Sequence, residues 1–354
     1  MFVKKLAWRT ISIASANAVA CNLISRNSEE DNKRILNMKH GQVRAYLKSI
    51  QCSEKKSDEI INRLSEDKQN CLIRLATEDK PLPQEVTFDV LWKSFTEKVP
   101  DWQHNSSTCV KFWEKYPHLE FLKVVKLQGD GDCGTCHAQA PVVLQHYVVT
   151  IDRNEPGVNF GMMSVPSLMR HLIDKCSKLE EFLNEEYEGG FALKNLMTIC
   201  QLGKSDITGF SVDALRDKQV VCNFLMNRLK THPALIAVFD VSTDFIASDQ
   251  LTYGSATDIM QAQEAEECHS MVLVGIRQDQ DGQYWFLCQN WWPHKPFIEV
   301  SYEYMIAAGV YIAFIDKTQF EIPRIPGLKV TKNLALSTAV DKGVNNAPGP
   351  ALKK

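Results

Sequence analysis

The sequence predicts an α+β protein in which helices and strands occupy different parts of the chain. Apolar residues return at intervals of three and four through residues 28–80, and helical patterns recur up to about residue 230. Beyond residue 234 the pattern changes to short β-branched and aromatic runs, which are typical of strands. Because the two kinds of element do not alternate, this order favours segregated layers over repeated βαβ units.

Residues 1–20 have the outline of a targeting segment. They combine three basic residues with a modestly apolar stretch that ends in Ala18-Val19-Ala20, as a secretory signal with its cleavage site does. The lack of acidic residues also fits a mitochondrial presequence or an ordinary amphipathic helix. We expect secretion or a lysosomal destination slightly more than a cytoplasmic one.

Residues 21–105 are expected to form a helical N-terminal region. Charged and amide residues are dense between 28 and 80, and the apolar spacing predicts two or three amphipathic helices. These helices fit either a small appendage or a pro-segment that covers a groove. Pro81-Leu82-Pro83 ends the pattern, because proline cannot continue a helix.

A main domain is expected over residues 106–322. Residues 121–127 (FLKVVKL) resemble a strand, and helical regions are expected at 136–151, 161–187 and 192–230. Five further strands are expected at 234–240, 271–276, 284–288, 297–300 and 310–314. Residues 323–354 contain few large apolar side chains, so this tail is expected to be largely disordered.

Composition and charge limit the partners. The 354 residues are 44 % hydrophobic, enough for a sizeable core, and their formal net charge of −3 gives no electrostatic reason to expect nucleic acid. No run of about 18 apolar residues occurs, so no membrane span is expected. The 11 cysteines are an odd number, which leaves at least one thiol unpaired within the chain and the redox compartment open. The sequence does not indicate an oligomeric state.

Residues 129–140 read GDGDCGTCHAQA, and the run Cys133-Gly134-Thr135-Cys136-His137 fits four chemistries. It matches a haem-attachment motif, although the strand-rich half of the chain is a poor host for a small haem domain. A redox dithiol would need a βαβ layout, which the element order lacks. A zinc site could be completed by Cys268-His269, but there is no second C-x-x-C. The fourth interpretation is a cysteine nucleophile.

A cysteine nucleophile needs a base, and the base needs a group that orients it. His269 opens an apolar run at 269–276, and Asn290 follows the run at 284–288. Cys136 itself would begin a helix, where the positive end of the helix dipole favours a thiolate.

In this order the residues resemble the papain-like cysteine peptidases. That family shows a Gln-Gly turn, Cys-Gly-x-Cys, a strand opened by histidine, and Asn-x-Trp; here these are Gln128-Gly129, Cys133–Cys136, His269 and Asn290-Trp291-Trp292. Glu188-Gly189-Gly190-Phe191 resembles the glycine pair that binds an extended substrate backbone. The resemblance covers residues 110–320 in short islands.

The resemblance implies a papain-like fold with a helical left lobe, a β-sheet or barrel right lobe, and an active-site cleft between them. It implies a peptidase that needs no metal or cofactor and acts on a polypeptide substrate. The catalytic residues would be Cys136 as nucleophile, His269 as base, Asn290 as its orienting group and Gln128 as an oxyanion donor. The residues near the substrate would be Gly189, Gly190, Phe191, Ser270 and Trp292.

The chain departs from the family pattern at several points. Asp130-Gly131 lengthens the turn after Gln128, Pro141 lies inside the nucleophile helix, and His137 follows the nucleophile where an aromatic residue is usual. Pro293 replaces the expected glycine after Trp292. The alternative to an active thiol hydrolase is therefore a catalytically impaired papain-fold module that binds peptides.

Overall fold

The structure is a computed structural model, and it describes residues 41, 44–45, 48, 54–63, 85–104, 106–127, 136–162, 191–265, 267–316 and 331–332. The chain divides into two compact units, 1–73 and 74–354. The first unit includes helix α3 (Glu54–Arg63), which lies in the region where amphipathic helices are expected. The predicted boundaries at residues 20, 105 and 322 stay predictions.

The second unit is a mixed α+β structure with one large sheet. Its longer helices are α5 (Phe88–Lys98), α6 (Cys136–Arg153), α9 (Phe191–Cys200), α10 (Lys218–Leu229) and α12 (Ala256–Gln263), and shorter ones are α11 (Thr243–Ala247) and α13 (Tyr302–Ala307). Three-residue and four-residue 3-10 helices occur at η1 (Pro100–Trp102), η2 (Phe112–Lys115), η3 (Glu120–Leu122) and η5 (Lys204–Asp206). None of the helices described is both long and apolar enough to cross a bilayer.

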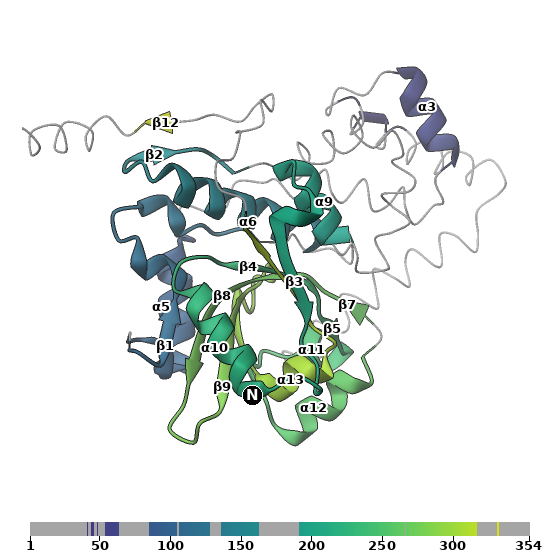
Figure 1. The fold of residues 1–354 in the computed structure, drawn as a ribbon. Helices are drawn as coiled ribbons and strands as arrows, with labels where there is room; N and C mark the ends of the chain where they lie inside the picture. The colour runs from purple at the N-terminus through teal and green to yellow at the C-terminus, as the bar shows by residue number, and fades with distance from the viewer. Residues whose placement is uncertain are drawn as a thin grey trace, which may run out of the picture. The chain divides into compact units, whose positions relative to one another are not determined.

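The large sheet has the order β3-β11-β4-β8-β9-β10-β6, and β1 pairs with β8 off this path. Its strands are β1 (Cys109–Lys111), β3 (Ile207–Ser211), β4 (Ala234–Val238), β6 (Thr252–Tyr253), β8 (Met271–Gln278), β9 (Tyr284–Gln289), β10 (Phe297–Ser301) and β11 (Tyr311–Ile315). Two small sheets pair β2 (Val158–Asn159) with β12 (Thr331–Lys332) and β5 (Asp240–Val241) with β7 (Glu267–Cys268). Figure 1 shows the strands of the large sheet curving around a shared interior.

Strand β8 organises this sheet. Its first half pairs with β4 and its second half with β1, while β9 pairs along its other edge. Gly275 lies against β1, because a Cβ there would be 2.7 Å from the carbonyl oxygen of Val110. The register of β8 against β9 also shifts between Leu273 and Gly275. A side chain at this point would push β1 away from the sheet.

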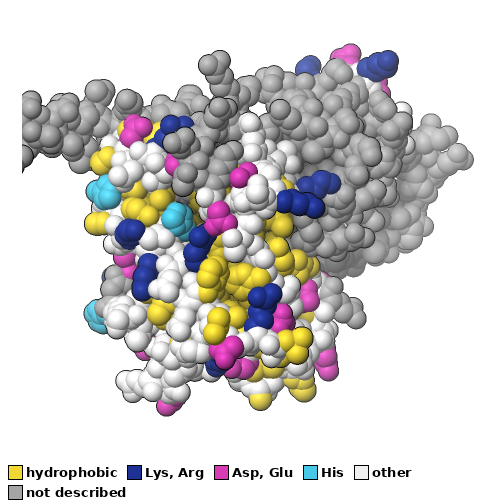
Figure 2. Space-filling view, in the orientation of Figure 1, with side chains coloured by type: hydrophobic (Ala, Val, Ile, Leu, Met, Phe, Trp, Pro, Cys, Tyr) yellow, Lys and Arg dark blue, Asp and Glu magenta, His cyan; other side chains and the backbone are white. Residues whose placement is uncertain are grey.

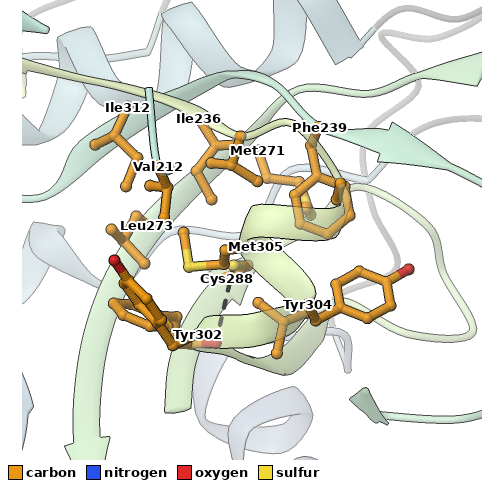
Figure 3. Close-up of a cluster of buried hydrophobic side chains, with 14 of the residues drawn as sticks. Val212, Ile236, Phe239, Met271, Leu273, Cys288, Tyr302, Tyr304, Met305 and Ile312 are labelled. Atoms are coloured by element: carbon orange, nitrogen blue, oxygen red, sulfur yellow. Dashed lines mark hydrogen bonds between the residues drawn. The ribbon is translucent and has the colours of Figure 1, made fainter. Parts of the chain in front are cut away.

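Both faces of the sheet are buried around β4 and β8, which explains their continuous apolar sequences. Met271 and Leu273 point into a core cluster that also includes residues of α10, α13 and β11 (Figure 3). Val272 and Val274 are also fully buried but are not part of that cluster, and α6 packs against β4 and β8. Helix α6 therefore lies against the framework from which the candidate site is built.

The five strands expected after residue 234 are confirmed, with ends that differ by one or two residues. The strand expected at 121–127 is wrong: residues 120–122 form a 3-10 helix, and 123–127 have no regular structure. The run is mostly apolar with lysines three residues apart, and no strand among the described residues pairs with it. The helical region expected at 192–230 is interrupted by β3, a short strand that pairs with β11. The helix expected at 161–187 falls largely outside the described residues.

Pro141 is accommodated inside α6 without ending it. Proline has no N–H, so it cannot donate to the carbonyl of His137 one turn earlier. The buried amide of Asn195 on α9 donates to this carbonyl instead, with an Nδ2–O distance of 3.0 Å. Helix α6 continues past Pro141 to Arg153, and the neighbouring helix α9 supplies the donor that proline cannot.

A buried ion pair crosses the sheet from β8 to β10. The guanidinium of Arg277 donates to both carboxylate oxygens of Glu299 at 2.9–3.1 Å. Trp102 Nε1 and Thr252 Oγ1 also donate to this carboxylate, at 2.7 and 3.0 Å. Glu299 is 1 % exposed, so its carboxylate depends on these three donor side chains in place of water.

Replacement of Arg277 by methionine should lower the free energy of unfolding by about 3–5 kcal/mol, because it leaves the Glu299 carboxylate buried without its counter-ion. The double variant Arg277→Met/Glu299→Leu should recover part of this loss. Lys93→Met is the surface control: Lys93 pairs with Glu97 at 3.9 Å with both side chains exposed, and its loss should stay below about 0.5 kcal/mol. Denaturant unfolding measures all three, and equal losses for Arg277→Met and Lys93→Met would contradict the prediction.

Candidate functional site

His269 lies at the bend between two strands that belong to different sheets. β7, which ends at Cys268, pairs with β5, while β8, which begins at Met271, pairs with β4 and β9. The His269 backbone N–H donates to the carbonyl of Phe239 at 2.8 Å, which fixes the bend. The side chain is 4 % exposed.

The antiparallel register of β8 and β9 places three residues of one corner together. Val272 is opposite Gln289, so continuation of the pairing brings His269 opposite Trp292. The two rings are stacked, with centroids 4.4 Å apart and planes inclined by 18°. His269 Nε2 and Asn290 Oδ1 are 2.7 Å apart in a buried hydrogen bond.

The hydrogen bonds of Asn290 decide which nitrogen of His269 carries a proton. Asn290 Nδ2 donates to the carbonyl of Lys295 at 3.1 Å, and Asn290 Oδ1 accepts from the Trp291 backbone N–H at 2.8 Å. The amide is thereby oriented, and its oxygen can only accept from the imidazole. His269 must therefore be protonated at Nε2, which leaves Nδ1 to accept a proton in the neutral ring.

Burial lowers the pKa of His269 to about 4. The hydrogen bond to Asn290 raises this pKa, and the positive charge of Lys295 lowers it further, but the loss of hydration is the largest of the three causes. The ring is therefore neutral at pH 7 in this environment, with the Nε2–H tautomer fixed by Asn290.

Lys295 is fully buried beside this corner, and its pKa is lowered to about 7, chiefly by burial. Its ammonium donates to the carbonyl of Phe245 and, at 3.0 Å, to the hydroxyl of Tyr253. The rings of Phe245, Tyr253 and Trp292 surround it, with centroids 4.5, 5.4 and 5.1 Å from Nζ. Cation–π contacts of this kind compensate part of the cost of burying the charge.

Cys136 is the first residue of α6 and is buried. The backbone N–H groups of a first helical turn carry the positive end of the helix dipole, which stabilises a thiolate. No acidic residue occurs in this turn to oppose that effect. Because α6 packs against β8, whose first residues follow His269, the candidate nucleophile and the candidate base belong to neighbouring elements.

The other predicted site residues fall into two groups. Ser270 and Trp292 lie beside His269; the Ser270 hydroxyl donates to the carbonyl of Ala237 at 3.0 Å and is buried, whereas the Trp292 ring is partly exposed. Phe191 is the first residue of α9, but its side chain is outside the described residues. Gln128, Gly189 and Gly190 also lie outside them, as do Cys133 and Asp130-Gly131.

Sequence reasoning missed Lys295 and the three aromatic rings that surround its ammonium. Nothing local predicts its burial, because a lysine in a loop ordinarily keeps its ammonium in water. The residues that receive it, Phe245 and Tyr253, belong to α11 and β6 and are 50 and 42 residues away in sequence.

Within the described part of the chain, no group of three or more His, Cys, Asp or Glu side chains is arranged to hold a metal ion. The zinc interpretation depends on Cys133, which is outside that part. On the face seen in Figure 2, basic and acidic side chains are interspersed with apolar ones.

No protein-family model matches the sequence, and no curated protein matches it significantly. Among solved structures, the chain is similar to the bromelain protease from Ananas comosus in complex with the E64 inhibitor, with 12 % identity, a TM-score of 0.37, and 59 % of this chain and 98 % of that one covered. It is also similar to the ragweed pollen allergen Amb a 11 cysteine protease in its proform, with 15 % identity, a TM-score of 0.38, and coverage of 59 % and 64 %. A second proform structure of Amb a 11 gives 14 %, 0.36, and 79 % and 93 %.

The lowered pKa of His269 predicts a specific pH dependence of stability. The unfolded chain binds a proton at this residue near pH 6.5 and the folded chain only near pH 4, so the contribution is complete above pH 6.5 and is lost as the pH falls to 4. We expect wild type to lose about 3 kcal/mol more than His269→Gln between pH 7 and pH 4. Urea unfolding at a series of pH values measures the difference. Stability that rises on acidification relative to the variant would mean that an anion holds the ring protonated.

Proposed function

We propose that this chain is a papain-like thiol hydrolase that cleaves peptide bonds, with Cys136 as nucleophile, His269 as base and Asn290 as the residue that orients the base. The observation that carries the proposal is the hydrogen bond between His269 Nε2 and Asn290 Oδ1, in which the amide oxygen can only accept because Nδ2 is held by the Lys295 carbonyl. It leaves Nδ1 as the proton acceptor, as general-base catalysis by this ring requires.

In the proposed reaction, Nδ1 of His269 accepts the Cys136 thiol proton while Sγ attacks the carbonyl carbon of the peptide bond. The carbonyl electron pair moves to oxygen and forms a tetrahedral oxyanion. When this intermediate collapses, the C–N bond breaks and the amine takes the proton from Nδ1. Water then attacks the thioester carbon and gives a proton to Nδ1. When this second intermediate collapses, the C–S bond breaks, the acid product leaves, and the Cys136 sulfur takes the proton back from Nδ1.

The oxyanion needs hydrogen-bond donors that are in place before it forms. The Cys136 backbone N–H, at the start of α6, is the first candidate. The Gln128 side chain is the second, and the loss of one such donor costs about 3–4 kcal/mol of transition-state stabilisation. Gly189, Gly190, Phe191, Ser270 and Trp292 are proposed to line the substrate path; the Ser270 hydroxyl is already bonded to Ala237, so Ser270 would act there through its backbone.

The environment of His269 sets a condition on activity. Burial and the charge of Lys295 both disfavour the imidazolium, so the thiolate at Cys136 and the Asn290 oxygen must together stabilise it when the proton moves. The lowered pKa of His269 therefore also favours a second candidate function. If the imidazolium is not stabilised, the partly exposed Trp292 could still contact a peptide, and the chain would be a papain-fold module that binds peptides without efficient turnover.

Alkylation of the full-length chain separates the two candidates. A cysteine activated by a neighbouring imidazole reacts rapidly with iodoacetamide at mildly acidic pH, because part of it is already thiolate. We expect one rapidly labelled site, identified by peptide mass analysis as Cys136, and loss of that rate in His269→Gln. Labelling of Cys136 only at the rate of an ordinary thiol would contradict the hydrolase and leave the binding module.

Hydrolysis of an unfolded protein substrate gives the direct measurement. Cys136→Ala should lower kcat by at least about 1,000-fold, since removal of a covalent nucleophile leaves only binding and oxyanion stabilisation. Cys133→Ala is the matched control from the same sequence run and should remain active. Equal activity of wild type and Cys136→Ala would refute the proposal.

A further inference from the structure

The loop of residues 290–296 carries Asn290 and Trp292 of the candidate catalytic corner, and three of its residues bond to elements outside it. Trp291 Nε1 donates to the Ser270 carbonyl at 2.8 Å, His294 Nε2 lies 3.2 Å from the Ile246 carbonyl, and Lys295 bonds to Phe245 and Tyr253. The Lys295 carbonyl accepts from Asn290 Nδ2, the Lys295 N–H donates to the Trp292 carbonyl at 3.1 Å, and the Asn290 N–H donates to the Pro296 carbonyl at 2.8 Å. The loop thus closes on itself around the Asn290 side chain.

The Lys295 side chain provides an attachment inside the core. Its ammonium bonds to the Phe245 carbonyl on α11 and to the Tyr253 hydroxyl on β6, two elements outside the loop. The Tyr253 hydroxyl in turn donates to the Gln250 carbonyl at 3.0 Å. Because the amine is fully buried, both contacts are made without competition from water.

A buried lysine is costly where an apolar side chain would fill the space. Transfer of an ammonium into a protein interior costs several kcal/mol, and a methionine of similar length costs nothing comparable. Stability alone therefore does not explain a lysine at position 295. Its backbone supplies one: the carbonyl of the anchored residue is the acceptor that orients the Asn290 amide, and this amide orients His269.

We infer that Lys295 is a positioning residue for the candidate base, anchoring the 290–296 loop so that Asn290 and Trp292 hold His269 in one tautomer and one orientation. The catalytic significance of this inference rests on the proposed function, but the control of the His269 ring by Lys295 does not. Lys295 does not touch the proposed substrate. Its carbonyl accepts a hydrogen bond from Asn290, and its ammonium contacts the Trp292 ring that stacks on His269.

The charged and titratable groups around Lys295 fit this role. Asp249 favours its protonated form, whereas Lys295 disfavours the protonated forms of His269 and His294. Tyr253 is the polar side chain that binds the ammonium directly, and burial raises its pKa to about 12, so it remains a neutral hydroxyl. At pH 6 the lysine is an ammonium and the imidazole is neutral. We choose this pH for the test.

The decisive measurement is the protonation pattern of the His269 nitrogens, observed by nuclear magnetic resonance in full-length protein labelled with ¹⁵N-histidine. The signals are assigned by their loss in His269→Gln. In wild type we expect one protonated nitrogen and one bare nitrogen, the pattern of a single Nε2–H tautomer. In Lys295→Met, the anchor is lost, and we expect averaged signals from two exchanging tautomers.

Lys111→Met is the matched control. Lys111 is also buried, its Nζ donates to the Trp102 carbonyl at 2.9 Å and pairs with Glu114 at 3.2 Å, and its element, β1, joins the opposite end of β8. This variant should lose stability of similar size and keep the single tautomer. If both variants keep it, or both lose it, the positioning role is refuted.

Tyr253→Phe decides the question if Lys295→Met does not fold, because it removes one oxygen partner of the ammonium and keeps the ring. Averaging of the His269 signals in this variant supports the inference, and an unchanged tautomer overturns it. Where wild type hydrolyses peptides, kcat of Lys295→Met should fall by up to about 100-fold with little change in KM. If Lys295→Met changes the tautomer but wild type does not hydrolyse peptides, the positioning role of Lys295 is supported and the proposed function is refuted. If wild type hydrolyses peptides and Lys295→Met keeps the tautomer, the proposed function is supported and the positioning role is refuted.

Discussion

The register between β8 and β9 is the constraint on which the candidate site depends. His269 precedes one strand and Asn290 follows the other, so their meeting is set by which residues of the two strands pair. A slip by one residue would turn each side chain to the opposite face. Such a slip would be costly because β8 is buried on both faces. Val272 and Leu273 would each move into a closely packed space shaped for a different side chain. The fold thus fixes the geometry of a hydrogen bond between residues 21 positions apart.

The strands from residue 234 onward could be predicted because each is a local run of apolar residues. His269 and Asn290 stand at the ends of two such runs and are hydrogen-bonded, while their catalytic roles stay predictions. The strand expected at 121–127 shows the limit of this reasoning. The run is mostly apolar, but its two lysines are three residues apart and so do not follow the period of two of a half-buried strand. Residues 120–122 form a 3-10 helix, and β1 is the segment that pairs with the second half of β8. Conversely, β3 contains Thr208 and Gly209 and has a weak local pattern, and it exists because β11 offers it an edge.

Lys295 could not have been assigned a role from sequence, because its meaning comes from residues on two other elements. A charged side chain in a loop is ordinarily solvated, and only the packing of α11 and β6 makes this one internal. The result is a site with two opposed requirements. The buried amine holds the loop that orients His269, yet its charge also makes protonation of that ring less favourable. Rigidity of the base and ease of its protonation are therefore linked through one residue.

Pro141 has a consequence for how the two helices of the site can move. In an uninterrupted helix each carbonyl is satisfied within the helix, and a neighbour can slide past without breaking a polar contact. Here the His137 carbonyl, one residue beyond Cys136, is satisfied by Asn195 of α9. A shift of α9 along α6 would break this hydrogen bond between two buried residues, so the start of α6 and the middle of α9 are expected to move together. By removing one hydrogen bond inside α6, Pro141 thus couples the motion of α6 to that of α9.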